Sequence, residues 1–322
     1  MEHVQGNSKA AAEDEAPRSS SQKVIYAAIV ANLGIATAKF IVAGITGSAA
    51  MVAEGIHSAV DTGNELLLLV GEKVAARRPD ARHPFGYGKA VYFWALIVAL
   101  SVFSLGGGLS IYHGIHSLRS PPALEDPFWN YVVLAVAFAF EGYSWNVSRR
   151  ALNSNRRPGD SLWQTVKGSK DASVFTVFIE DSAALLGLVV AALGIWLGHL
   201  LENPYIDPAA SILIGLLLVG AAFTLARQTG GLLVGAGVGV EQTGKLKDVF
   251  QADPAIDTVG QLMTMQLGPE DVLLTAAVRF KRGMRIDEVD VAIARLEQAV
   301  AECDPSIRRV YFEAAALRSG MR

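Results

Sequence analysis

The stretch Met51-Val-Ala-Glu-Gly-Ile-His-Ser-Ala-Val-Asp-Thr-Gly-Asn-Glu-Leu-Leu-Leu-Leu-Val-Gly71 is a long apolar segment that carries polar residues at helical spacing. Positions three or four apart share one face of a helix, so the polar residues form a single stripe: Glu54, His57, Asp61, Asn64 and Glu65. An ionisable group at membrane depth costs roughly 2.5–3.5 kcal/mol, and such groups mark sites or pathways. We therefore expect this stripe to face protein or water and not lipid.

The composition indicates a membrane bundle joined to a soluble part. The 322-residue chain is 51% hydrophobic and 18% charged, which is too apolar for an ordinary soluble protein and too charged for a wholly embedded one. Its formal net charge of −3 argues against a nucleic-acid-binding protein. The single cysteine, Cys303, excludes an intramolecular disulfide and a cysteine-based metal cluster within one chain.

Hydropathy predicts six transmembrane helices after a disordered tail at 1–22, in which no cleaved signal peptide is indicated. Lys39 lies within the first span, where snorkelling towards an interface is the expected role and a functional role the alternative. Each span is long enough to cross a hydrocarbon core, and the first two form a close hairpin. The expected spans are 25–47, 51–71, 90–116, 128–147, 171–201 and 206–226.

Basic residues concentrate in alternate loops. Lysine and arginine are numerous after the second and fourth spans and nearly absent after the first, third and fifth. The positive-inside rule then places both termini in the cytoplasm. We expect a multi-pass integral membrane protein in contact with lipid, in the cell (inner) membrane.

The C-terminal part has the sequence pattern of a soluble domain. Helical and strand-like patterns alternate in the order αββαβ, which predicts a small cytoplasmic α+β domain of ferredoxin-like type with its helices on one face of a sheet. The expected elements are 241–251, 256–267, 272–282, 286–302 and 307–316.

His57 and Asp61 lie one helical turn apart, and an imidazole with a carboxylate is a suitable half-site for a divalent transition metal. Asp181, in the otherwise apolar fifth span, is the best candidate for a partner on another helix. The adjacent Glu180 points about 100° away on an ideal helix. The alternative is a structural hydrogen-bond network between helices.

Two motifs give the chain a resemblance to a known family. They are Gly47-Ser48 followed by Ala53-Glu-Gly-Ile-His-Ser-Ala-Val-Asp61, and His83-Pro-Phe-Gly-Tyr-Gly-Lys-Ala90. With Asp181 and the αββαβ tail, the sequence resembles the cation diffusion facilitators over about 25–316. This resemblance implies a homodimeric exporter of zinc, manganese, iron or cobalt, with a cation-transport domain at 23–228 and a dimerisation domain at 229–322.

The resemblance also implies a tetrahedral transport site, of which His57, Asp61 and Asp181 fill three positions. Val177 stands where the family usually has His or Asp, so water or Glu180 would complete the site. Glu54 is a further, lower-ranked candidate. In the loop before the third span, Asp80 and His83 match a second metal site of some relatives, but Tyr87 replaces its second histidine. Relatives also use histidines in the tail, whereas every histidine here precedes it: His3, His57, His83, His113, His116 and His199.

The expected function is therefore export of a divalent transition metal from the cytoplasm in exchange for protons. Metal and protons compete for the same imidazole and carboxylates, which makes this coupling natural. The metal is a transported substrate, and no cofactor and no catalytic residues are expected. The rivals are a metal channel, a membrane-embedded metalloenzyme that uses His57 and Asp61, and a structural scaffold.

Overall fold

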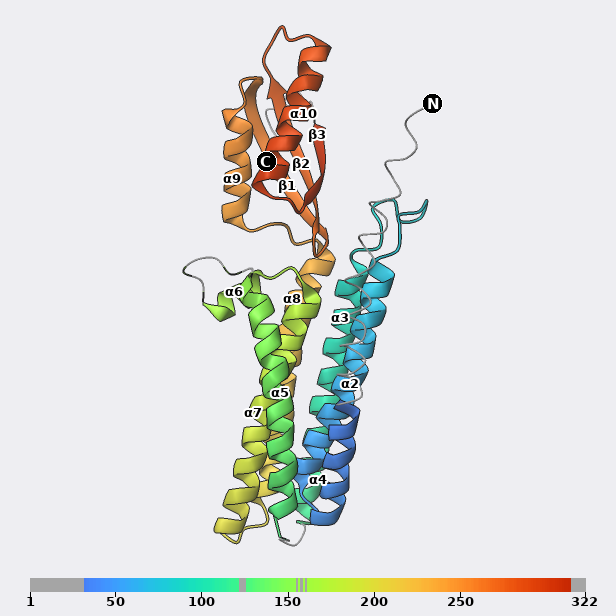
Figure 1. Cartoon of the computed structure of the whole chain (residues 1–322), viewed down its shortest axis with the longest axis vertical. Coiled ribbons are helices and arrows are strands. Elements are labelled where there is room, and N and C mark those ends of the chain that lie inside the picture. The colour runs from blue at the N-terminus through green and yellow to red at the C-terminus, as the bar shows by residue number, and fades with distance from the viewer. Residues whose placement is uncertain (1–31, 122–125, 155, 157–158, 160, 314–322) are drawn as a thin grey trace. The chain divides into compact units, whose positions relative to one another are not determined.

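The computed structural model describes residues 32–121, 126–154, 156, 159 and 161–313. The tail expected at 1–22 and the beginning of the first expected span, 25–31, lie outside these residues. Figure 1 shows the order of the elements along the chain.

Long helices occupy the stretches that hydropathy selects. Among the described residues, three helices are both long and apolar enough to cross a membrane: Ala90–Arg119, Ala172–Leu200 and Ile206–Val234. The helices α2 and α5 have 27 residues each, about 40 Å at ~1.5 Å per residue, but they carry more polar residues. The long helices have the bounds Asn32–Thr46, α2 Ala49–Ala75, α3 Ala90–Ser101 with η1 Val102–Gly108 and α4 Leu109–Arg119, α5 Phe128–Ser154, α7 Ala172–Leu200 and α8 Ile206–Val234, and a short helix, α6 Leu162–Gly168, precedes α7.

The described residues fall into two compact units. One contains the described residues up to Leu69 together with Ile97–Arg149 and Val177–Thr224, and it holds the polar stripe of α2. The other contains Val70–Leu96, Arg150–Thr176 and the described residues from Leu225 onward. The expected boundary at 228/229 falls within α8, which continues to Val234.

The start of α2 is held by the carboxylate of Asp207. After a turn at Gly47 with φ 65°, the backbone N–H groups of Ala49 and Ala50 donate to Asp207 Oδ2 over 2.5 and 3.3 Å, and Ser48 Oγ donates to Asp207 Oδ1 over 2.8 Å. A negative charge is favourable there because the first N–H groups of a helix have no partner within it. This contact fixes the end of α2 from which the stripe begins.

A glycine lets the third long helix pack directly on α8. A Cβ added at Gly107 would lie 2.7 Å from Val219 Cγ2 and 3.0 Å from the carbonyl oxygen of Gly215. Small residues at such contacts allow helix backbones to approach closely.

The C-terminal elements occur in the order α9 (Val240–Ala252), β1 (Ile256–Gly268), β2 (Asp271–Phe280), α10 (Ile286–Cys303) and β3 (Ile307–Glu313), which is the predicted αββαβ. The sheet order is β1-β2-β3. A tight turn makes β1 and β2 antiparallel, whereas β2 and β3 are parallel because α10 forms the crossover between them. Residues 314–316 of the last expected strand lie outside the described residues.

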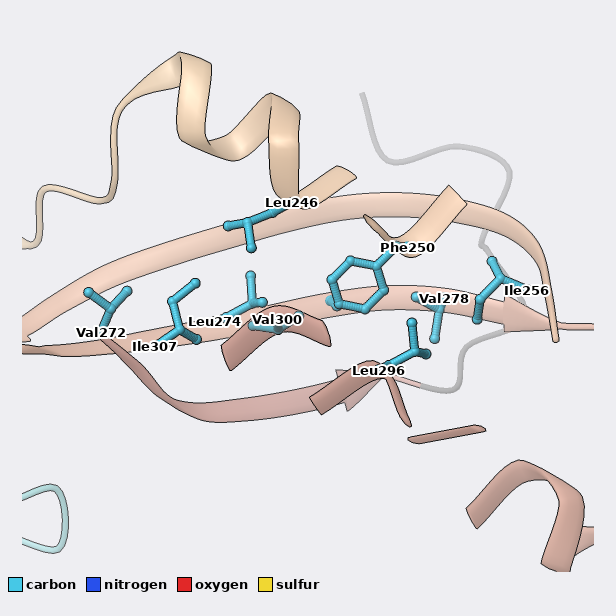
Figure 2. Packing of buried hydrophobic residues seen from close by; sticks show 10 residues of the cluster. Leu246, Phe250, Ile256, Val272, Leu274, Val278, Leu296, Val300 and Ile307 are labelled. Atoms are coloured by element: carbon cyan, nitrogen blue, oxygen red, sulfur yellow. The ribbon is translucent and has the colours of Figure 1, made fainter. Parts of the chain in front are cut away.

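Both helices of this part pack on the same face of the sheet. The side chains of β2 alternate in burial, and its buried residues share one cluster with those of α9 and α10 (Figure 2). This cluster is the core that holds the soluble part together: Leu246, Phe250, Ile256, Val272, Leu274, Ala276, Val278, Leu296, Val300 and Ile307.

Removing the largest side chain of this cluster should loosen the sheet. Phe250 is fully buried, so Phe250→Ala should cost about 3–5 kcal/mol through lost burial and a cavity. Tyr311→Ala removes an aromatic side chain that is 53% exposed and should cost far less, about 0.5 kcal/mol. Amide hydrogen exchange of β2 in the full-length protein measures both. Equal loss of protection in the two variants would contradict the assignment of this core.

Candidate metal transport site

The polar stripe of α2 is buried. His57 is 1% exposed, Asn64 is fully buried, and the Asp61 side chain is 14% exposed. These three residues follow one another at i, i+4 and i+7, so one face of the helix presents an imidazole, a carboxylate and an amide in succession. The structure thus gives the stripe the protein-facing environment that its polarity requires.

Several polar atoms of this face have no hydrogen-bond partner among the described residues. They are both ring nitrogens of His57, Oδ1 of Asp61 and Oδ1 of Asn64. His57 Nδ1 lies 3.3 Å from Asp61 Oδ2, close enough for an ion pair but not aligned as a hydrogen bond. A buried polar group without a partner costs about 1–3 kcal/mol, and native proteins leave few of them. An imidazole nitrogen and a carboxylate oxygen are ligands that fit a divalent transition metal.

Glu180 of α7 reaches this face of α2. Its Oε1 accepts a hydrogen bond of 2.7 Å from Asn64 Nδ2, and the carboxyl group is buried. Thr176 lies one turn earlier on α7, is fully buried, and has an Oγ1 without a partner among the described residues. By helical spacing Thr176 shares a face with Glu180, whereas the partly exposed Val177 shares a face with Asp181.

Asp181 faces α5 instead. Its Oδ2 accepts hydrogen bonds from Ser144 Oγ over 2.9 Å and from Ser148 Oγ over 3.3 Å. Adjacent helical residues point about 100° apart, and among the described residues it is the carboxyl group of Glu180, not that of Asp181, that is hydrogen-bonded to α2. In the described part of the chain no three His, Cys, Asp or Glu side chains converge on one point where they could hold a metal ion. His57, Asp61 and Asp181 are therefore not assembled as a ligand set in this conformation.

Glu54 is engaged by a lysine. Lys39 Nζ lies 3.0 Å from Glu54 Oε2 and donates to Ser58 Oγ over 2.8 Å, and both charged side chains are buried. The expectation that Lys39 snorkels to an interface is wrong, because a carboxylate partner at depth satisfies its charge. No local pattern indicated that these two residues would pair, since they lie on different helices.

The C-terminal end of the polar stripe on α2 is also acidic. Glu65 Oε1 accepts from Asn32 Nδ2 over 2.9 Å, while Oε2 is buried without a partner among the described residues. Glu141 of α5 is 8% exposed and is a further buried carboxyl group among the long helices. Glu141 lies in the expected span 128–147 without a predicted role, although its isolation among apolar residues was a signal for one.

The loop before α3 is closed by Tyr87. The Tyr87 hydroxyl donates to Asp80 Oδ2 over 2.7 Å, and the rings of His83 and Tyr87 lie 4.1 Å apart. His83 Nδ1 is 3.4 Å from Asp80 Oδ1, and both side chains are about half exposed. The tyrosine therefore takes up the carboxylate that a second metal site would need.

Low pH should destabilise this loop by protonating Asp80, and the Tyr87→Phe variant tests the cause. The Tyr87 hydrogen bond, followed by those from the His83 and Arg82 N–H groups, lowers the pKa of Asp80 below its usual value. A lowered pKa stabilises the loop above the ordinary Asp value of about 3.9, and this contribution is lost as pH falls through the lower value. Tyr87→Phe should move the pKa of Asp80 back towards ~3.9, as measured by carboxyl NMR titration, and Tyr311→Phe should not. An unmoved pKa in Tyr87→Phe would refute the role of this hydrogen bond.

Comparison with known proteins bears on the whole helical part. The family described as cation efflux transmembrane domain matches residues 25–234, from before the first described helix to the end of α8. The chain belongs to the cation efflux family. The resemblance to cation diffusion facilitators is thereby confirmed, and the family is one of integral membrane transporters.

The names of two of the curated relatives include a transported metal, zinc in one and manganese in the other. The mitochondrial proton-coupled zinc antiporter SLC30A9 of Xenopus laevis is 36% identical over 236 residues, covering 73% of this chain and 42% of the relative. Metal tolerance protein C4 of Arabidopsis thaliana is 30% identical over 272 residues, covering 82% and 58%. The manganese efflux system protein MneP of Bacillus subtilis is 26% identical over 244 residues, covering 72% and 75%. The chain thus spans less than half the length of the frog protein.

Proposed function

We propose that this cation efflux family member is a secondary active transporter that exports a divalent transition metal of the zinc, manganese, iron or cobalt class from the cytoplasm by proton antiport. The observation that carries the proposal is the buried imidazole of His57 and the Asp61 oxygen one turn away, both without hydrogen-bond partners among the described residues. The zinc antiporter and manganese efflux relatives support it by their names.

The coupling follows from the chemistry of these groups. A metal ion binds the neutral imidazole and the ionised carboxylate, so a proton on either group competes with the ion. Proposed ligands are His57 and Asp61 of α2 with Asp181 or Glu180 of α7, and moving Asp181 into the set requires α7 to turn relative to the arrangement described here. Glu54 is engaged by Lys39, and Asp80 and His83 by the tyrosine-closed loop, so we place these three outside the ligand set.

The proposed architecture has six membrane crossings, a cytoplasmic ferredoxin-like tail at 229–322 and a homodimeric assembly through that tail. The outward surfaces of the long helices support the six crossings. Large apolar side chains are exposed there, and such side chains are favourable in contact with lipid but unfavourable in contact with water. Examples are Phe103, Phe138, Phe140, Leu186, Leu193, Trp196, Leu216 and Phe223. We propose the cell (inner) membrane. The zinc antiporter relative is mitochondrial by its name. Fractionation of cells that express this protein decides between the cell membrane and a mitochondrial membrane.

The topology can be tested by cysteine labelling. In a Cys303→Ser background, cysteines placed near Arg78, near Arg156 and in the tail should all react with an impermeant maleimide from the cytoplasmic side, because the basic loops stay inside. A cysteine near Glu202, in the turn between α7 and α8, should react only from the opposite side. Labelling near Arg156 from that opposite side would overturn the proposed topology.

Flux in proteoliposomes tests the function itself. With zinc, manganese, iron, cobalt or cadmium on one side, the wild type should move at least one of these metals while a trapped pH indicator reports protons moving the other way. Dissipating the proton gradient should slow uptake that works against a metal gradient. Metal conductance without proton counterflow would identify a channel instead.

A further inference from the structure

A buried lysine lies beside the proposed transport site. Lys39 is 1% exposed, and its ammonium group is held by Glu54 and Ser58 of α2. A fully buried charge persists only when it is paired and hydrogen-bonded, and Lys39 meets both conditions. Its place is therefore fixed by α2.

Glu54 has coordination capacity that Lys39 leaves unused. Its Oε2 faces Lys39, whereas Oε1 is buried without a partner among the described residues. This second oxygen packs against Gly187 of α7, where an added Cβ would lie 2.5 Å from it. The carboxylate of Glu54 thus lies between three helices and is one hydrogen-bond donor short of satisfaction.

The Lys39–Glu54 pair lies next to the metal-binding face of α2. Glu54 precedes His57 by three residues, so the two share a helix face, and Ser58 follows His57 directly. The ammonium group of Lys39 is held 2.8 Å from the hydroxyl of Ser58, the residue directly after His57. An ion bound to His57 and Asp61 would lie within the field of the lysine.

We propose that Lys39 sets the metal selectivity of the transporter by holding Glu54 out of the ion's coordination shell. This inference rests on the proposed function. While Lys39 occupies Glu54, the site offers the ion an imidazole nitrogen and few carboxylates, a set that suits zinc. Without the lysine, Glu54 supplies a further hard oxygen ligand one turn from His57, and oxygen-rich sites suit manganese better.

The test compares manganese and zinc flux in variants of the full-length protein in proteoliposomes. Lys39→Met should raise the ratio of manganese to zinc kcat/KM about tenfold, which corresponds to about 1.4 kcal/mol. Lys39→Met combined with Glu54→Gln removes both charges and should return the ratio to the wild-type value. Glu54→Gln alone leaves the ammonium group uncompensated beside the site, so it should weaken the apparent affinity for both ions without raising the ratio.

An unchanged ratio in Lys39→Met, or a raised ratio that survives in the double variant, would overturn the inference. If Lys39→Met does not fold, the Glu54→Gln variant decides, because wild-type affinity for both ions in that variant would overturn it equally. A wild type that moves metal with unaltered ratios in the variants leaves the proposed function standing. A wild type that moves no metal removes both.

Discussion

Asp61→Ala should reduce metal flux at least about 100-fold while the protein remains folded. Loss of a residue that only supports a metal ligand costs 10–100-fold, so loss of a direct ligand should reach or exceed the upper end of that range. Asp61 Oδ1 has no partner among the described residues, and Oδ2 lies 3.3 Å from His57 Nδ1 without forming an aligned hydrogen bond, so removal of this side chain should spare the fold. Metal uptake by proteoliposomes and size-exclusion chromatography measure the two effects.

Asp248→Ala is the matched control. Asp248 is an exposed aspartate on α9 in the soluble part, so its loss should leave flux unchanged. Flux in Asp61→Ala within a few-fold of that in Asp248→Ala would remove Asp61 from the site.

Glu180→Ala should be nearly as damaging as Asp61→Ala. Among the two adjacent carboxylates of α7, Glu180 is the one hydrogen-bonded to α2, through Asn64, and it can therefore complete the site that Val177 leaves short. On this reading Val177→His crowds the helix contact and does not raise the selectivity for zinc. Asp181→Ala should also lose transport if α7 turns during the cycle.

The four variants belong in one flux assay with zinc and manganese. Full activity in Glu180→Ala together with a shift towards zinc in Val177→His would contradict the role of Glu180. That outcome would instead mean that the α7 pair has lost a ligand at 177, since residues four apart share a face.

Most of the helical fold could be predicted because hydropathy and loop charge are independent signals that agree. The start of α8 at Ile206 was predicted, but its end at Val234 was not. The expected span ended at 226, yet the helix continues through Gly230 and Gly231, because glycine lowers helix propensity by only about 1 kcal/mol. The αββαβ order could be predicted because its periodicities are distinct and its turn contains Gly268 and Pro269.

The polar face of each helix in the site could be predicted, but not how these faces meet. The face of α2 follows from the spacing of its own residues, and α7 follows from its two acidic residues. The rotation of α7, which decides whether Glu180 or Asp181 meets α2, depends on packing against α5 and cannot be read from α7 alone. The Lys39–Glu54 pair was missed for a similar reason, because no local pattern relates residues on two different helices.

The central claim is that the transported ion binds the imidazole of His57, and X-ray absorption spectroscopy of the protein loaded with one zinc ion per chain tests it most directly. Zinc should show imidazole scattering from one nitrogen at about 2.0–2.1 Å with oxygen ligands at about 2.0–2.2 Å. In His57→Asn the imidazole scattering should disappear, although the other five of the six histidines remain. Imidazole scattering that persists unchanged in His57→Asn would place the ion elsewhere and contradict the claim.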